Sequence, residues 1–243
     1  MSLEYQKEDT DAADQERLAE IPLPTPYYTI ILLLAMGAVY LAQLSVGIED
    51  SVLVAGFVKP AFLEKGEYWR ILTGAALHGS IPHILMNGYA LYSFGRLMEL
   101  LTNRAHLAIV FLLAAVGGGV LSLIFLPAGI SVGASGGIVG LIGYLLVYAF
   151  RRRQFVSAEF RKSLIVNIGF ILVFGLVLYQ VVDNYGHIGG LVTGIVYGLI
   201  QIPSDEYQNP QNAGGFAKIA GAAAIVIYLL ASAVAIFRLL SFH

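Results

Sequence analysis

Long stretches without charged residues constrain this chain more than any other feature of its sequence. A Lys, Arg or Asp at the centre of a bilayer costs roughly 2.5 to 3.5 kcal/mol on insertion scales, and a spanning helix needs about 20 residues. The windows free of Lys, Arg, Asp and Glu are Ile21–Ile48, Ile71–Gly95, Ala105–Phe150, Ser163–Val182, Asn184–Ser204 and Ile219–Phe237. The chain is therefore predicted to be an all-α, polytopic membrane protein.

Composition also indicates lipid, rather than water, as the main solvent. Only 12% of the 243 residues are charged and 58% are hydrophobic, whereas a soluble domain carries about 25% charged residues. The net charge of -2 leaves no basic excess for nucleic acid. Because the sequence contains no Cys, disulfides, thiolate zinc sites and a cysteine nucleophile are excluded. We expect the lipid bilayer as a partner, and no nucleic acid.

The third window is long enough for two helices, and Pro127 and Gly129 mark the break between them. The prediction is then a six-helix core plus a seventh C-terminal transmembrane helix, at residues 27–47, 80–101, 104–126, 135–150, 163–182, 187–202 and 217–240. With the N-terminus inside, ten of the 14 Lys and Arg residues fall on inner segments and helix ends. This excess favours a multi-pass protein of the cell membrane with a cytoplasmic N-terminus and an outer C-terminus.

The chain divides into three regions. Residues 1–26 are predicted to be an acidic cytoplasmic tail, because they lack the positive start and apolar stretch of a signal peptide. Residues 27–202 form the core, whose loop 48–79 mixes aromatic and basic residues as segments at a membrane interface do. Residues 203–243 comprise a linker rich in Pro, Asn, Gln and Gly and the seventh helix.

Two of the predicted helices are too short to cross the bilayer. Counting back from the inner ends at Phe150 and Ile202, the helices that begin at Ser135 and His187 each contain 16 residues. At about 1.5 Å per residue each spans ~24 Å, against a hydrocarbon core of ~30 Å. A serine and a histidine are thus expected at matching depth, several ångströms below the outer surface.

Glycines would allow these two helices to touch. Gly133, Gly136, Gly137, Gly140 and Gly143 lie near or on one helix, and Gly186, Gly190, Gly194 and Gly198 recur every four residues on the other. Small residues at this spacing permit close backbone contact between helices in a bilayer. Packing alone accounts for most such faces, but a Ser and a His at one height favour a reactive pair.

The predicted second helix supplies further polar groups. His83 and Asn87 are four residues apart and therefore share a face, and His78 precedes them. An enzyme that attacks a peptide carbonyl needs hydrogen-bond donors where the oxyanion develops, and His83, Asn87 and the backbone N–H of Ser135 would suit. Hydrogen bonding that only joins helices is the alternative, and for His78 it is the favoured one.

The sequence resembles the rhomboid family of intramembrane serine proteases. The motifs that carry this resemblance stand in the family's order: Trp69-Arg70, His78-x4-His83-x3-Asn87, Gly133-x-Ser135-Gly136 and His187-x2-Gly190-x3-Gly194. The resemblance implies a Ser135–His187 dyad that cleaves transmembrane protein substrates without a metal or other cofactor. It also implies oxyanion stabilisation by His83 and Asn87, helix packing by the glycines and anchoring of the first outer loop by Trp69 and Arg70.

Two positions need separate interpretation. The family often carries an aromatic residue four positions after the nucleophile, stacked on the histidine, whereas this chain has Val139. Asp183 precedes His187 by four residues and suggests a triad. We interpret it instead as a helix-end residue near water, because the resembled family uses a dyad.

Two other functions remain as alternatives. A catalytically weak or inactive rhomboid-like binding module would keep the helices and lose Ser135 or His187, and both are present here. A small transporter would also bury polar residues, but it should show inverted repeats or paired broken helices, and no clear repeat is visible. Neither the natural substrate nor an oligomeric state follows from the sequence.

Overall fold

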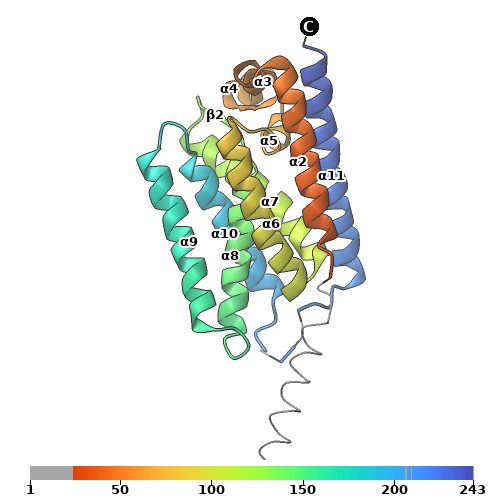
Figure 1. Ribbon diagram of the computed structural model, residues 1–243, viewed down its shortest axis with the longest axis vertical. Helices are drawn as coiled ribbons and strands as arrows, with labels where there is room; N and C mark the ends of the chain where they lie inside the picture. The colour runs from red at the N-terminus through yellow and green to blue at the C-terminus, as the bar shows by residue number, and fades with distance from the viewer. Residues whose placement is uncertain (1–23, 206, 209, 243) are drawn as a thin grey trace, which may run out of the picture.

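The structure, a computed structural model, describes residues 24–205, 207–208 and 210–242. In this part of the chain the helices with at least 17 residues run roughly along the long axis (Figure 1). They are α2 (Tyr27–Val46), α6 (Ile81–Leu101), α7 (Arg104–Phe125), α8 (Ser135–Arg151), α9 (Ala158–Val177), α10 (Asn184–Gln201) and α11 (Gly215–Leu240). The predicted all-α class is confirmed. The predicted tail, 1–26, lies almost wholly outside the described residues.

Four of these helices, α2, α7, α9 and α11, are long and apolar enough to cross a membrane. Such helices support a polytopic membrane protein. The other three helices, α6, α8 and α10, are not both long enough and apolar enough by the same measure. Helix α8 has only 17 residues, and α6 carries His83, Asn87, Arg96 and Glu99. The shorter or more polar helices are the ones predicted to carry the reactive side chains.

Capping side chains set two helix starts differently from the prediction. Helix α9 begins at Ala158 rather than 163, because the hydroxyl of Ser157 accepts a hydrogen bond from the N–H of Phe160, at 3.2 Å. Helix α10 begins at Asn184 rather than 187, because the Asp183 carboxylate accepts from the N–H of Gly186, at 2.9 Å. Charge-free windows locate the apolar part of a helix, whereas its caps decide where the helix starts.

The loop between α2 and α6 folds into short elements at one end of the bundle (Figure 1). These are α3 (Ile48–Ala55), β1 (Phe57–Val58), α4 (Lys59–Lys65) and α5 (Arg70–Thr73). Strand β1 pairs antiparallel with β2 (Ile130–Ser131), with Phe57 opposite Ser131. The sequence analysis missed this pairing, since two-residue strands show no hydrophobic period. The pairing joins the outer loop to the segment that precedes Ser135.

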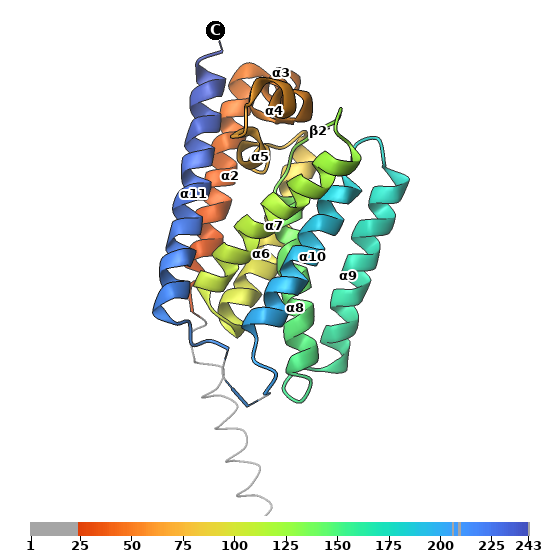
Figure 2. The same ribbon diagram turned by 180° about the vertical axis from the view of Figure 1, so that it is seen from behind.

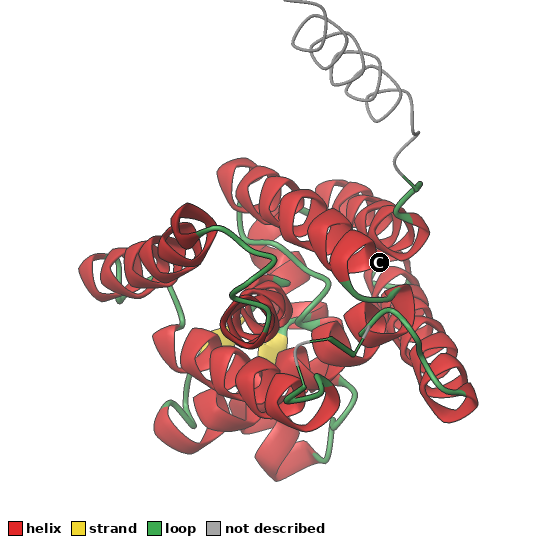
Figure 3. Cartoon of the chain, turned by 90° about the horizontal axis from the view of Figure 1, so that it is seen from below, coloured by secondary structure: helices red, strands yellow, loops and turns green. Residues whose placement is uncertain are grey.

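Helices α7, α8 and α10 form the closely packed centre, and α11 lies along α2 and α7 (Figure 2). Tyr228 of α11 is fully buried, and its ring meets the Phe111 ring edge-on with the centroids 5.2 Å apart. The end-on view places α9 at the rim of the bundle (Figure 3). The seventh helix is thus packed against the core, while α9 contacts it mainly through α8 and α10.

Candidate active site

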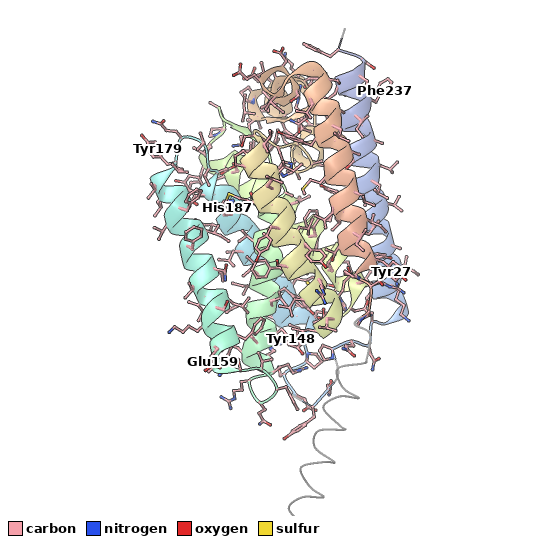
Figure 4. All side chains as sticks on the ribbon, viewed as in Figure 1. Tyr27, Tyr148, Glu159, Tyr179, His187 and Phe237 are labelled. Atoms are coloured by element: carbon pink, nitrogen blue, oxygen red, sulfur yellow. The ribbon has the colours of Figure 1, made fainter. Side chains whose placement is uncertain are left out.

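Ser135 and His187 meet in the half of the bundle that carries the short loop helices (Figure 4). Ser135 is the first residue of α8, and its Oγ lies 2.9 Å from Nε2 of His187. His187 stands in the first turn of α10 and is 9% exposed. The distance is that of a hydrogen bond, which the Ser135 hydroxyl donates when Nε2 carries no proton.

The glycine faces explain how the two helices approach so closely. A Cβ added to Gly190 would lie 2.1 Å from the carbonyl oxygen of Gly136, and one added to Gly194 would lie 1.9 Å from that of Gly140. No side chain fits at these distances. Of the glycines predicted to pack at the site, Gly136, Gly190 and Gly194 are therefore in backbone contact, and this contact brings His187 close to Ser135.

Gly133 brings the α6 side chains to the same place. Its φ of +125° is a conformation that L side chains rarely adopt. A Cβ built on it would lie 2.7 Å from Nε2 of His83 and 3.4 Å from Nδ2 of Asn87. The structure thus places both expected oxyanion donors beside the residue two positions before Ser135.

His78 joins this cluster through Asn87. The Asn87 side-chain nitrogen lies 2.9 Å from Nε2 of His78, which is fully buried. Gln43 holds the backbone of His78, because its side chain accepts from the His78 N–H at 2.8 Å and donates to the carbonyl at 3.0 Å. Burial, with a smaller contribution from His83, lowers the pKa of His78 to about 3. The neutral ring can therefore accept one Asn87 proton and leave the other free.

The start of α8 differs from the starts of its neighbours. The side chains of Ser80, Asn103, Ser157 and Asp183 cap α6, α7, α9 and α10, respectively. Helix α8 follows Ala134 and has no side-chain cap. The first backbone N–H groups of a helix lack intrahelical acceptors. Those at Ser135 are thus not occupied by a cap and can donate to an oxyanion.

A cavity of about 880 Å³ opens onto these groups. Ser135, His187, His83 and Asn87 all line it, together with Phe174 and other apolar residues of α9. Val139 is buried and lines it too, one turn after Ser135. Within the described part of the chain no aromatic ring stacks on His187. The cavity combines apolar walls with a few convergent polar groups, as ligand sites commonly do.

Asp183 is a helix-end residue, as predicted, its side chain is 22% exposed, and three protein groups donate hydrogen bonds to its carboxylate. The hydroxyls of Ser131, at 2.6 Å, and Ser122 donate to it, as does the N–H of Gly186. Burial alone would raise the pKa of Asp183, but these hydrogen bonds and the nearby Lys59 hold it below the usual range. Nδ1 of His187 has no hydrogen-bond partner among the described residues. Among the described residues, Ser135 and His187 thus form a hydrogen-bonded pair that no third side chain extends.

Lys59 is a residue that the sequence analysis did not single out. Its side chain is fully buried, and Nζ lies 3.8 Å from Oδ2 of Asp183. Burial lowers the pKa of Lys59, and Asp183 partly opposes this effect. Lys59 resembled one of several interfacial cations in the loop. A Lys at the junction of β1 and α4 carries no motif that would have revealed this partner.

Trp69 and Arg70 hold the loop together. The Arg70 guanidinium donates to the carbonyls of Leu53 and Gly56, at 3.1 and 2.9 Å. It also lies 4.6 Å from the Trp69 ring centroid, and Arg238 of α11 lies 5.1 Å from the same ring. Such contacts fit the predicted anchoring role and extend it to the seventh helix.

Comparison with known proteins identifies relatives over this region. The family model described as "Rhomboid domain" matches residues 65–204. Rhomboid protease GluP of Bacillus subtilis (strain 168) is 34% identical over 145 residues, which are 60% of this chain and 28% of that protein. RHOMBOID-like protein 6, mitochondrial, of Arabidopsis thaliana is 32% identical over 163 residues, 64% of this chain and 52% of that protein.

Inactive rhomboid protein 1 of Rattus norvegicus also matches, with 30% identity over 139 residues, which are 56% of this chain and 16% of that protein. The chain thus covers 52% or less of the length of each of these three relatives. The range matched by the family model contains Ser135, His187, His83 and Asn87.

Proposed function

The chain belongs to the rhomboid family, and from this premise we propose that it is an intramembrane serine endopeptidase with Ser135 and His187 as its catalytic dyad. The observation that carries the proposal is the 2.9 Å contact between Ser135 Oγ and His187 Nε2. That contact lies on a large cavity with polar groups on one wall. A nucleophile within hydrogen-bond reach of a base is the arrangement that covalent hydrolysis needs.

In the proposed reaction, His187 Nε2 takes the proton of Ser135 as Oγ attacks the scissile carbonyl carbon. The tetrahedral intermediate collapses, and the leaving amine receives the proton from His187. Ser135 then carries the new amino-terminal fragment as an ester. A water molecule, deprotonated by His187, attacks this ester, releases the carboxylic acid and restores the hydroxyl.

His83, Asn87 and the Ser135 N–H are proposed to stabilise the oxyanion. Support comes from the two side-chain nitrogens beside Gly133 and from the uncapped start of α8. The hydrogen bond between Asn87 and His78 holds the Asn87 amide in a fixed orientation beside Gly133. The negative charge develops only during attack, so these donors favour the transition state over the bound substrate.

We propose that α2 and the six long helices after it cross the membrane, with the N-terminus in the cytoplasm and the C-terminus outside. The end next to the α8–α9 turn carries Arg151, Arg152, Arg153, Arg161 and Lys162. A concentration of positive charge marks the cytoplasmic side. The dyad lies toward the opposite end, so cleavage is proposed near the outer face of a cell membrane (Figure 4).

Transmembrane proteins are the proposed substrates. The Bacillus subtilis relative is named a protease, whereas the rat relative is named inactive. Retention of both Ser135 and His187, in contact, favours the enzyme over the inactive binding module. A transporter role has no comparable support, since the polar groups here gather around one nucleophile.

Cleavage of a single-span substrate by the purified full-length chain in detergent tests this function. The Ser135→Ala and His187→Ala variants should each lose all turnover above background, because either change dismantles the same chemical unit. Ser45→Ala removes an exposed hydroxyl at the end of α2 and should behave as wild type. Near-normal turnover by either dyad variant would rule out the assigned mechanism.

A further inference from the structure

The Asp183 carboxylate connects four segments that surround the dyad. Gly186 lies in the first turn of α10, Ser131 ends β2, Ser122 lies in the last turn of α7, and Lys59 begins α4. The first three donate hydrogen bonds to the carboxylate, and the ammonium of Lys59 lies 3.8 Å away. A charged acceptor with several donors forms the stronger class of protein hydrogen bond.

Two of these links lead directly to the reacting side chains. Ser131 stands four residues before Ser135, and the intervening chain passes Gly133, whose N–H donates to the carbonyl of Gly74 at 2.9 Å. On the other side, the His187 N–H donates to the Asp183 carbonyl at 3.1 Å. Asp183 therefore connects the segment 131–135, which ends at Ser135, to the first turn of α10, which carries His187.

The position of Lys59 explains why residue 183 is an aspartate rather than a neutral capping residue. Its Nζ has no hydrogen-bond partner among the described residues, and its side chain is fully buried. Its backbone N–H donates to the carbonyl of Gly129 at 3.2 Å, so the residue is fixed beside β2. An Asn could accept from Gly186 equally well, but only a carboxylate balances a buried ammonium.

We propose that Asp183 is a positioning residue for peptide-bond cleavage, with Ser131 and Lys59 as its partners. It holds the segment before Ser135 and the first turn of α10 at the separation where Oγ meets Nε2. The inference rests on the proposed function of the dyad. It assigns Asp183 no proton transfer, since its carboxylate faces Ser122, Ser131 and Lys59 while His187 Nδ1 stays unpaired.

The test is the reaction of the purified full-length protein with a fluorophosphonate probe, followed over time. The rate constant reports the geometry of each dyad, and the final amplitude reports the fraction of molecules that are folded. Ser131→Ala should lower the rate constant about tenfold, and Asp183→Asn by up to about 100-fold, since small displacements of reacting groups cost this much. The amplitudes should remain near wild type.

Three further variants sharpen the test. Ser131→Thr keeps the hydroxyl and should restore most of the rate that Ser131→Ala loses. The double variant Lys59→Met/Asp183→Asn should react faster than Asp183→Asn alone. In the single variant the buried Lys59 ammonium has lost its partner, whereas the double variant contains no unpaired buried charge. Asp50→Asn, at an exposed carboxylate of α3, is the matched control and should keep the wild-type rate.

The outcomes separate positioning from folding and from the dyad itself. Wild-type rate constants in both Ser131→Ala and Asp183→Asn would overturn the positioning role, as would a loss of amplitude with no change in rate. If Asp183→Asn does not fold, Ser131→Ala still decides the question. A wild-type protein that does not react would overturn the dyad and this inference together, whereas a reactive wild type with unaffected variants overturns the inference alone.

Discussion

Helices α9 and α10 follow each other in the chain and have similar lengths, 20 and 18 residues, yet they pack in opposite ways. Helix α10 buries His187 and a row of glycines against α7 and α8. Helix α9 lies at the side of the bundle (Figure 2), buries only Leu164 and Gly175, and leaves most of its apolar side chains exposed.

The contrast indicates that the two helices have different tasks in the proposed mechanism: α10 positions His187, whereas α9 forms a wall of the cavity. In the proposed mechanism the position of His187 relative to Ser135 must be fixed to within about 0.5 Å, and backbone contact at the glycines supplies that precision. The α9 residues that line the cavity, Phe174 among them, need only provide an apolar wall. One extra methyl group is therefore expected to be damaging where α10 contacts α8 and harmless on the exposed face of α9.

Glycine substitutions test this with the largest expected effect. In Gly194→Ala the new Cβ would lie 1.9 Å from the Gly140 carbonyl oxygen, so α10 must move away from α8. Overpacking of this kind costs about 1–3 kcal/mol. We expect a lower thermal unfolding midpoint in detergent and loss of most turnover.

Gly169→Ala is the matched control on α9, where no atom lies within 4 Å of the added Cβ. Alanine favours a helix over glycine by about 1 kcal/mol, so this variant should be as stable as wild type or more so, with normal turnover. Equal damage from both substitutions would contradict the assigned difference between the helices.

Substitutions of the proposed oxyanion donors should give the next largest effect. Asn87→Ala and His83→Ala each remove one donor while others remain, and such losses typically lower the rate about 10² to 10³-fold. The two effects should differ, because His78 forms a hydrogen bond with Asn87 but meets His83 only through an edge-on ring contact, with the centroids 5.0 Å apart. Single-turnover cleavage measures them. Unchanged rates in both variants would reassign the pair to hydrogen bonding between the loop and α6.

Substrate changes should have a smaller effect. The cavity reaches a helical substrate only if that helix unwinds, and Gly or Pro weakens a helix by about 1 or 3 kcal/mol relative to Ala. Replacing such residues after the scissile bond by Leu should slow cleavage several-fold or more. We also expect a small residue before the bond, since glycines surround Ser135. Equal cleavage of Ala and Phe variants at that position would refute the second expectation.

The smallest expected effect is that of chelators and reductants. The sequence contains no Cys, and the proposed reaction uses only Ser and His. Turnover measured with EDTA or with a thiol reductant should match the untreated protein. Loss of activity with EDTA that added zinc restores would require His78, His83 and His187 to be reconsidered as metal ligands.

Helix positions and the approach of Ser135 to His187 could be predicted because they depend on short-range patterns. Window lengths place Ser135 at a helix start, and four-residue glycine spacing indicates which faces can touch. The positions of helix ends could not be predicted as well, since Ser157 and Asp183 cap their helices independently of hydropathy. The short helices α3, α4 and α5 within the loop 48–79 were not predicted, because they are too short to show a hydrophobic period.

The connection between Lys59 and Asp183 was beyond sequence reasoning. These residues are far apart in the chain, and they meet only because β1 pairs with β2 and α7 ends beside α10. Neither contact has a periodic signal. Single polar residues whose partners come from distant loops require the folded structure to be understood.

The most direct test of the central claim is to locate the residue that a fluorophosphonate probe modifies in the purified protein. Reaction followed by mass spectrometry of the peptides should find the probe on Ser135. It should find none in Ser135→Ala, and greatly slowed modification in His187→Ala, because His187 activates the hydroxyl. Modification of a different residue, or an equal rate in His187→Ala, would contradict the account of a Ser135–His187 dyad.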